Sequence, residues 1–224
     1  MNKIDSEIKN VKQRLSEFSY KKKLIELFID EAVESSVPDI ILLLLNLQTN
    51  TVNEEVLVNY INNSASENEK FIIAPHNIKK EAIEKLKNSI LKKVVLFSEK
   101  EEKKELKNYQ VIIVDTIGIL TKIYSYADIA YVGGGFTKSG VHNVLEPATF
   151  GVPIIIGPNY NKFIEAKELV NKQACFVADN SQKLSVLLTG FFSENKKRLE
   201  AGSLSLNYVI EKTGASEKIL NYIK

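Results

Sequence analysis

From about residue 70 onward, short continuous apolar runs alternate with longer segments in which apolar residues recur at helical spacing. The short runs predict buried strands, and the amphipathic segments between them predict helices. The expected strands are 40–47, 71–74, 94–97, 111–114, 129–132, 153–156 and 175–177, and the expected helices are 54–62, 78–90, 119–126, 145–150 and 163–171, with two or three more in the tail. Continuous apolar strands separated by helices are typical of a parallel sheet covered on both faces. The fold class is therefore α/β, a doubly wound parallel sheet.

The first part of the chain has a different pattern, because it contains only helical periodicity. Its recurring apolar residues are Ile4, Ile8, Val11, Leu15, Phe18, Leu24, Leu27, Phe28 and Val33. This spacing predicts one long or two shorter amphipathic helices that end before Pro38. We expect an N-terminal helical segment over 1–37, followed by the sheet domain over 38–224. The helices would pack on the domain or on a second copy of the chain, which leaves self-association through residues 1–36 as an open interpretation.

Composition narrows the class of protein. The chain has 224 residues and a formal net charge of +2, and its lysines are interspersed with glutamates, so no nucleic-acid partner is expected. The single cysteine, Cys175, lies in an apolar run and is expected to be buried; one thiol fits a reduced, cytoplasmic setting. No apolar run approaches the ~20 residues that span a bilayer. No metal-ligand spacing and no Ser-His-Asp set is visible, so neither a metal nor another cofactor is expected.

Polar and glycine-rich segments follow several of the predicted strands, at the sheet edge where ligands of such folds bind. The first runs from Asp115 to Gly118. It would open a helix, whose N-terminus attracts phosphate, and Gly118 would let a ligand approach the backbone. The alternative interpretation is an ordinary helix cap made by Asp115 or Thr116.

The second segment is the run of three glycines from Gly133 to Gly135, directly after a buried strand. Glycine is entropically costly at such a place, so the run indicates either a tight turn or a close contact with a ligand. It does not reproduce the GxGxxG spacing of dinucleotide-binding loops.

The third segment, His142 to Pro147, places a histidine, Asn143 and Glu146 just ahead of a short helix. Glu146 could accept hydrogen bonds from a ribose diol, Asn143 could bind phosphate or ribose, and His142 could neutralise phosphate. A capping arrangement between Asn143 and Glu146 is the alternative, and both can hold together. His76, the other histidine, also follows a strand and could be a ligand contact or an ordinary loop residue.

At these residues the chain resembles the 3-deoxy-D-manno-octulosonic acid (Kdo) transferases, over roughly residues 70–224. The resemblance is carried by the segments Pro75-His76, Asp115–Gly118, Tyr124–Asp128, Gly133–Gly135, His142–Ala148, Phe150–Pro153 and Gly157-Pro158. It implies the GT-B fold, in which a Rossmann-like C-terminal domain binds the donor CMP-Kdo. It also implies an inverting, metal-independent transfer of Kdo to a lipid A precursor in lipopolysaccharide biosynthesis, at the cytoplasmic face of the inner membrane.

By the same resemblance, Pro75, His76, 117–119 and 143–146 would contact CMP. Together with the glycines and His142, the full set of expected CMP-binding residues is Pro75, His76, Ile117, Gly118, Ile119, Gly134, Gly135, His142, Asn143, Val144, Leu145 and Glu146. In the family, the catalytic carboxylate base and the lipid acceptor site belong to an N-terminal domain. We therefore expect no catalytic residue in this chain and no transfer by it alone.

Three features depart from the family. No sequence like the acceptor domain is found here, Pro75-His76 lacks the arginine usual in that segment, and the first strand is not followed by the usual glycine-to-tryptophan loop. Residues 1–50 do not resemble the family. Two further interpretations are another GT-B protein, such as a UDP-sugar transferase or epimerase, and a non-catalytic self-associating module.

Overall fold

The computed structural model of the chain describes residues 42–47, 52–99, 108–118 and 123–214, with side chains from Glu54 onward. Its centre is a sheet with the strand order β3-β4-β2-β1-β5-β6-β7, in which every neighbouring pair is parallel. The strands are β1 (Leu42–Leu47), β2 (Lys70–Pro75), β3 (Val94–Leu96), β4 (Val111–Ile113), β5 (Ile129–Val132), β6 (Ile154–Ile156) and β7 (Cys175–Val177). The expected doubly wound α/β architecture is confirmed.

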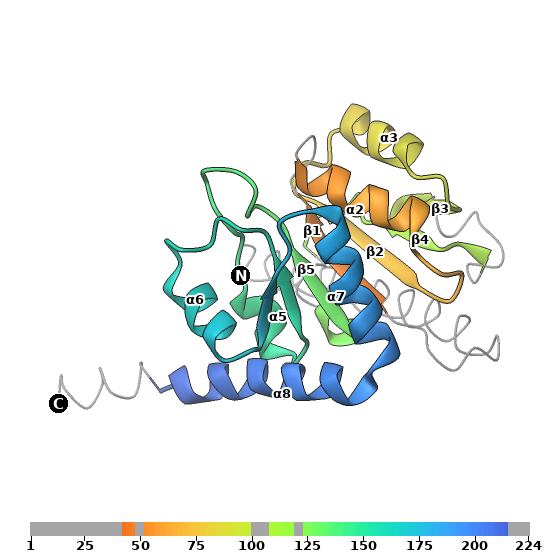
Figure 1. Ribbon diagram of the computed structural model, residues 1–224. Coiled ribbons are helices and arrows are strands. Elements are labelled where there is room, and N and C mark those ends of the chain that lie inside the picture. The colour runs from red at the N-terminus through yellow and green to blue at the C-terminus, as the bar shows by residue number, and fades with distance from the viewer. Residues whose placement is uncertain (1–41, 48–51, 100–107, 119–122, 215–224) are drawn as a thin grey trace, which may run out of the picture.

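Helices connect the strands and cover the sheet. They are α2 (Val52–Asn63), α3 (Lys80–Ser89), α5 (Leu145–Thr149), α6 (Ile164–Asn171), α7 (Ser181–Ser193) and α8 (Asn195–Lys212), with short 3-10 helices at Phe97–Glu99 and Tyr124–Tyr126. The helices α2 and α7 pack against each other, and the long helix α8 lies along the bottom of the view in Figure 1, packed on α5 and α7. The two final helices agree with the prediction for the tail.

Alternate residues of the strands enter separate cores on the two sides of the sheet. Phe71 and Ile73 of β2 pack with apolar side chains of α2, α3 and α7, whereas Ile72 and Ala74 join a second cluster on the opposite face. Every residue of β2 is buried, which explains the uninterrupted apolar run 71–74 that follows Lys70 in the sequence. Burying one such large side chain contributes about 1.5–3 kcal/mol.

Several expected elements are shortened or fall outside the described residues. Only the end of the helix expected over 119–126 is described, with Ile123 helical and Tyr124–Tyr126 in a 3-10 helix, and 119–122 lie outside the described residues. The strand expected over 94–97 stops at Leu96, where the chain turns into a 3-10 helix and Ser98 binds Asp115. The predicted helical segment over 1–37 and the boundary at 37/38 lie outside the described residues.

The topology brings the candidate site together. The chain builds the sheet outward from β1 through β2 to the outer pair β3 and β4, and then returns to the other side of β1 with β5. Ligands of doubly wound folds bind at the carboxyl ends of the strands where the order reverses in this way. The loops after β2, β4 and β5 all begin at this edge, on both sides of β1.

Candidate functional site

The two histidines of the chain meet across the end of β1. His76 follows β2 and His142 lies in the loop after β5, and their ring centroids are 5.3 Å apart with an interplanar angle of 34°. His76 is exposed, whereas His142 is half-buried. Two imidazoles from different loops thus face the same space, which the sequence alone could place only at the same edge of the sheet.

The glycine run explains how His142 reaches this position. The loop folds back on itself, with the His142 N–H donating to the Gly133 carbonyl at 3.0 Å and the Thr137 N–H donating to the Gly134 carbonyl at 2.9 Å. Gly134 has a φ of +98°, and a Cβ there would lie 2.3 Å from the Gly140 carbonyl oxygen and 2.9 Å from His142 Cδ2. The run is therefore a tight turn, and Gly134 is required by the close approach of its own chain.

Gly135 is constrained in the same way by the neighbouring loop. A Cβ at Gly135 would lie 2.7 Å from the Cα of Gly157, and the Gly135 carbonyl accepts a hydrogen bond from Asn159 N–H at 2.7 Å. Gly134 and Gly135 are both buried. The space beside their Cα atoms is filled by protein, so any contact with a ligand would involve their backbone groups.

Asn143 joins the loop to helix α5 and to Glu146. Its side-chain oxygen accepts a hydrogen bond from the Leu145 N–H at 3.0 Å, and its Nδ2 donates to Glu146 Oε1 at 3.3 Å. The helix begins at Leu145 with Val144 as the capping position, so Asn143 stands one residue earlier than a standard N-cap. Asn143 and Glu146 therefore do interact, but through their side chains and not as the capping pair considered from the sequence, because Val144 is the N-cap. Among the described residues, no donor binds the second carboxylate oxygen of Glu146, Oε2.

The loop after β4 forms one wall of a hollow of ≈ 220 Å³. The residues that line it are Ala74, Pro75, His76, Ile78, Val114, Thr116, Ile117 and Gly118. Four predicted CMP-binding residues are thereby gathered around one cavity: Pro75, His76, Ile117 and Gly118. Ile119, the fifth residue of this part of the prediction, lies outside the described residues.

Asp115 is fixed by a contact that the sequence did not predict. Its Oδ1 accepts a hydrogen bond from the Ser98 N–H at 3.0 Å, and its Oδ2 accepts one from the Ser98 hydroxyl. The carboxylate thus ties the β4 loop to the 3-10 helix after β3. The helix cap considered from the sequence would involve residues 119–122, which lie outside the described residues.

Within the described part of the chain, three buried side-chain polar atoms have no hydrogen-bond partner: Thr116 Oγ1, Tyr124 Oη and His142 Nε2. A buried polar atom without a partner is unfavourable unless water or a ligand satisfies it. Thr116 lines the hollow, His142 faces His76, and Glu146 lies close enough to Tyr124 to raise the pKa of its hydroxyl, after burial as the main cause. Two of these atoms, in Thr116 and His142, therefore belong to residues that line the candidate site.

Tyr124 is a site residue that sequence reasoning missed. Its ring is fully buried in the core and stacks on Phe150, with centroids 6.4 Å apart. The sequence placed Tyr124 in a helix and gave no indication that the charge of Glu146 acts on its hydroxyl, because that proximity depends on how distant segments pack.

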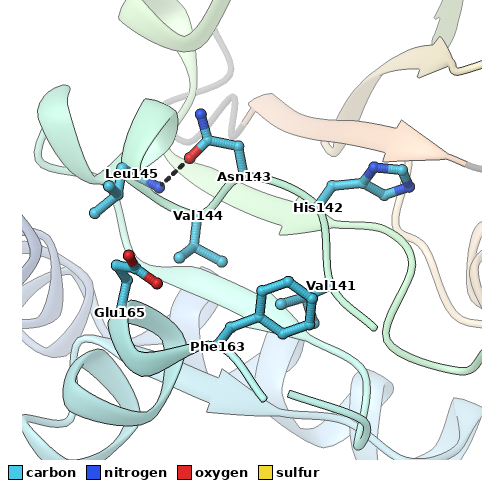
Figure 2. Close-up of a pocket in the computed structure, with 7 residues that line it drawn as sticks. All are labelled: Val141, His142, Asn143, Val144, Leu145, Phe163 and Glu165. Carbon is cyan, nitrogen blue, oxygen red and sulfur yellow. Dashed lines mark hydrogen bonds between the residues drawn. The ribbon is translucent and has the colours of Figure 1, made fainter. Parts of the chain in front are cut away.

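A second hollow of ≈ 180 Å³ lies on the other side of His142 and is shown in Figure 2. Its lining consists of Val141, His142, Asn143, Val144, Leu145, Phe163 and Glu165. In Figure 2 the His142 ring points away from Phe163 and Glu165, while Phe163 and Val144 form an apolar floor. Phe163 and Glu165 come from the start of α6 and were not predicted as site residues.

The protonation of His142 responds to this setting. Burial, and secondarily the neighbouring His76, hold the pKa of His142 below its ordinary value of 6.5. Desolvation and a nearby cation both disfavour the charged imidazolium. An anion between the two rings would stabilise the imidazolium and so offset both causes, which makes the pair suited to binding phosphate.

The site contains no visible metal centre. Among the described residues, no group of three or more His, Cys, Asp and Glu side chains could hold a metal ion. Cys175, at the start of β7, is buried as predicted, and burial raises the pKa of its thiol far above the usual range.

No protein-family model matches the chain. Over 88 residues it is 42% identical to 3-deoxy-D-manno-octulosonic acid transferase from Aquifex aeolicus, a match that covers 39% of this chain and 25% of the relative. It is 34% identical over 147 residues to the transferase of the same name from Chlamydia trachomatis, covering 63% of this chain and 32% of the relative. The matched segments thus span about a quarter to a third of these relatives. The predicted resemblance to Kdo transferases is confirmed.

Solved structures show the same fold. The C-terminal CMP-Kdo-binding domain of WaaA from Acinetobacter baumannii superposes with a TM-score of 0.67 at 18% identity, covering 84% of this chain and 98% of that domain. WaaG, a glycosyltransferase involved in lipopolysaccharide biosynthesis, gives a TM-score of 0.55 at 14% identity, covering 89% of this chain and half of that one. The described domain has the fold of the C-terminal domain of GT-B glycosyltransferases.

Proposed function

We propose that this domain binds CMP-Kdo and forms the donor half of a Kdo transferase that glycosylates a lipid A precursor in lipopolysaccharide biosynthesis. One observation carries the proposal. His76, His142 with its unpartnered Nε2, and the Asn143–Glu146 pair converge at the strand edge where nucleotides bind in such folds. The matches to transferases with this name and to a CMP-Kdo-binding domain support the choice of donor.

The phosphate of the donor would lie between the two imidazoles. His142 Nε2 is buried and has no described partner, and the exposed ring of His76 closes the same space from the β2 loop. Phosphate oxygens accept strong hydrogen bonds from protonated imidazoles. When the bond between Kdo and CMP breaks, the negative charge left on the phosphate would be stabilised by these two rings.

The ribose and the base would occupy the flanks of this phosphate site. Glu146 is held by Asn143 through one carboxylate oxygen, so the other is available to accept from a ribose hydroxyl. The base would lie in the hollow lined by Pro75, Ile117 and Gly118, where the Ile117 side chain is 80% exposed and offers apolar surface to a flat ring. The unpartnered hydroxyl of Thr116 in this hollow could bind a polar edge of the base.

The acceptor half of the reaction is implied by the family alone. The N-terminal domain of a GT-B enzyme would supply the catalytic carboxylate that activates the acceptor hydroxyl, and also the surface that binds the lipid A precursor. The complete enzyme would work at the cytoplasmic face of the inner membrane. Among the described helices, none is both long and apolar enough to cross a bilayer.

Nucleotide titration calorimetry tests the donor assignment. We expect CMP to bind, and UDP and GDP to bind at least tenfold more weakly. The reason is that the hollow that contains Thr116 would contact the nucleobase and so distinguish cytosine from uracil and guanine. Combined substitution His76→Asn and His142→Asn should abolish the heat of CMP binding while the far-ultraviolet spectrum stays native. Preference for UDP would favour the UDP-sugar transferase or epimerase interpretation, and no binding of CMP at millimolar concentration would overturn the proposal.

Self-association through residues 1–36 remains a separate proposal. Its support is the helical apolar periodicity of that segment in the sequence. Multi-angle light scattering of the chain with and without residues 1–36 tests this proposal. A mass above that of the monomer for the longer chain, with monomer mass for the shorter one, supports association. Monomer mass for both chains contradicts it.

A further inference from the structure

A third hollow, of ≈ 250 Å³, lies beside the candidate site and is lined by one glycine and by residues with polar side chains. It is formed by Lys138, Gly140, Asn159, Asn161 and Lys162. The lining therefore contains two ammonium groups and two amides, and no carboxylate. Within the described part of the chain, neither lysine forms an ion pair or a side-chain hydrogen bond, unlike Lys87, Lys172 and Lys212 elsewhere on the surface.

Two separate loops bring these lysines together, and backbone contacts lock the loops to each other. Lys138 belongs to the loop after β5 and Lys162 to the loop between β6 and α6. The Asn159 N–H donates to the Gly135 carbonyl at 2.7 Å. Gly140 has a φ of +83°, and a Cβ there would lie 2.1 Å from Phe163 Cε2 and 3.2 Å from the Asn159 carbonyl oxygen. The packing of the two loops thus sets the backbone positions from which both lysine side chains extend.

The third hollow adjoins the donor site through shared residues. Phe163 packs on Gly140, which lines the third hollow, and also lines the hollow of His142 and Asn143. Gly140 in turn lies against Gly134 and, through it, beside His142. Figure 2 shows the Phe163 ring beside Val141 and the His142 ring on the far side of that residue. A ligand that has its phosphate at His142 could therefore extend along this wall toward Lys138 and Lys162.

We propose that Lys138 and Lys162 bind the carboxylate of the sugar acid carried by the donor, and so select a nucleotide-linked sugar acid over a neutral sugar. This inference rests on the proposed function. In CMP-Kdo the anomeric carbon bears both the carboxylate and the phosphate ester, so the two anionic groups are close neighbours. An ordinary neutral sugar has no group that would make use of two unpaired ammonium ions, whereas a carboxylate forms charge-assisted hydrogen bonds with both.

The test compares two ligands that differ by the sugar acid. CMP carries the phosphate alone, and CMP-Kdo carries the phosphate and the carboxylate. The variants are Lys138→Met, Lys162→Met and the double substitution, which keep the long apolar stem and remove the charge. Lys167→Met is the matched control, because Lys167 is also exposed and lies on α6 one turn from this wall without lining the hollow.

The double substitution should weaken CMP-Kdo binding about tenfold and each single one about threefold, as expected for charged hydrogen bonds near the surface. The affinity for CMP should change less than twofold in every variant, and the Lys167→Met protein should bind both ligands like the original. Equal weakening of CMP and CMP-Kdo would overturn the inference, since it would indicate a general effect of charge. Unchanged CMP-Kdo affinity would also overturn it while leaving the CMP site intact, and failure of the original protein to bind CMP would refute the proposed function itself.

Discussion

The imidazole rings of His76 and His142 lie 5.3 Å apart at an interplanar angle of 34°, although one follows β2 and the other follows β5. The strand between them, β1, brings the two loops to the same edge. Burial of His142 and the proximity of His76 both disfavour its charged form. The charged form of His142 is therefore unfavourable in the free protein, and the two rings are well placed to bind an anion that would stabilise it.

Phosphate binding should be linked to protonation of His142. A bound phosphate stabilises the imidazolium, so its pKa should rise on binding and the complex should take up protons near neutral pH. We expect CMP-Kdo affinity to increase as the pH is lowered from about 7.5 to about 6, and titrations in buffers of different ionisation enthalpy to show proton uptake. The change of CMP-Kdo affinity with pH should be smaller in the His142→Asn protein. An identical pH dependence in both proteins would show that another group takes up the proton.

The same histidine should affect stability in the free protein. Its folded pKa lies below 6.5, so in the window just below that value the unfolded chain binds a proton that the folded chain does not. The free energy of unfolding should therefore be at its full value above about pH 6.5 and decrease as the pH falls through and below it. Urea denaturation of the original and His142→Asn proteins between pH 5 and 8 measures this, and the variant should show the shallower decrease.

Glu146 should contribute to binding through the ribose. Replacing its carboxylate in Glu146→Gln should weaken CMP binding about tenfold, the cost of a lost hydrogen bond to a charged acceptor. The variant should also discriminate less between CMP and 2′-deoxy-CMP, because the diol contact is gone. Glu67→Gln is the control, since Glu67 is exposed before β2 at the opposite edge of the sheet. Unaltered discrimination between the two nucleotides would contradict the ribose assignment.

Gly134 and Gly118 provide a comparison between strain alone and strain with a clash. Both have positive φ, +98° for Gly134 and +88° for Gly118. Among the described residues, a Cβ at Gly118 would meet no atom within 4 Å, whereas one at Gly134 would lie 2.3 Å from the Gly140 carbonyl oxygen. Gly118→Ala should cost about 1–2 kcal/mol of unfolding free energy from the backbone conformation. Gly134→Ala should cost a further ~1–3 kcal/mol because the loop must move. Equal midpoints of urea unfolding for the Gly118→Ala and Gly134→Ala proteins would show that the loop can move without an energetic cost.

Thr116 should show opposite effects on stability and binding. Its Oγ1 is buried without a described partner, so Thr116→Val removes an unsatisfied polar atom and keeps the shape of the side chain. The variant should unfold at the same or a higher temperature than the original protein, yet bind CMP several-fold more weakly if the hydroxyl contacts the base. Loss of thermal stability would indicate that the hydroxyl already has a partner in the free protein, and unchanged CMP affinity would remove Thr116 from the site.

Much of the fold could be predicted from local pattern. The apolar runs ending at Pro75, Val114 and Val132 identified strands because a strand buried on both faces has few polar positions. The polar and glycine residues after them marked one edge of the sheet, since all strands run parallel. The strand expected over 94–97 ends one residue early, at Leu96, where Phe97–Glu99 form a 3-10 helix and Ser98 binds Asp115 of a neighbouring loop.

The sequence by itself determined the strands, the helices between them and the set of loops that could bind a nucleotide, because these depend on the spacing of apolar residues and on short polar motifs. Only the tertiary structure decided that β4 lies between β3 and β2, that His76 meets His142, and that Tyr124 lies near Glu146. It also showed that Gly134 is required by Gly140 of its own loop. The physical reason is that these are contacts between distant segments, and their geometry follows from strand order and packing, which local periodicity does not specify.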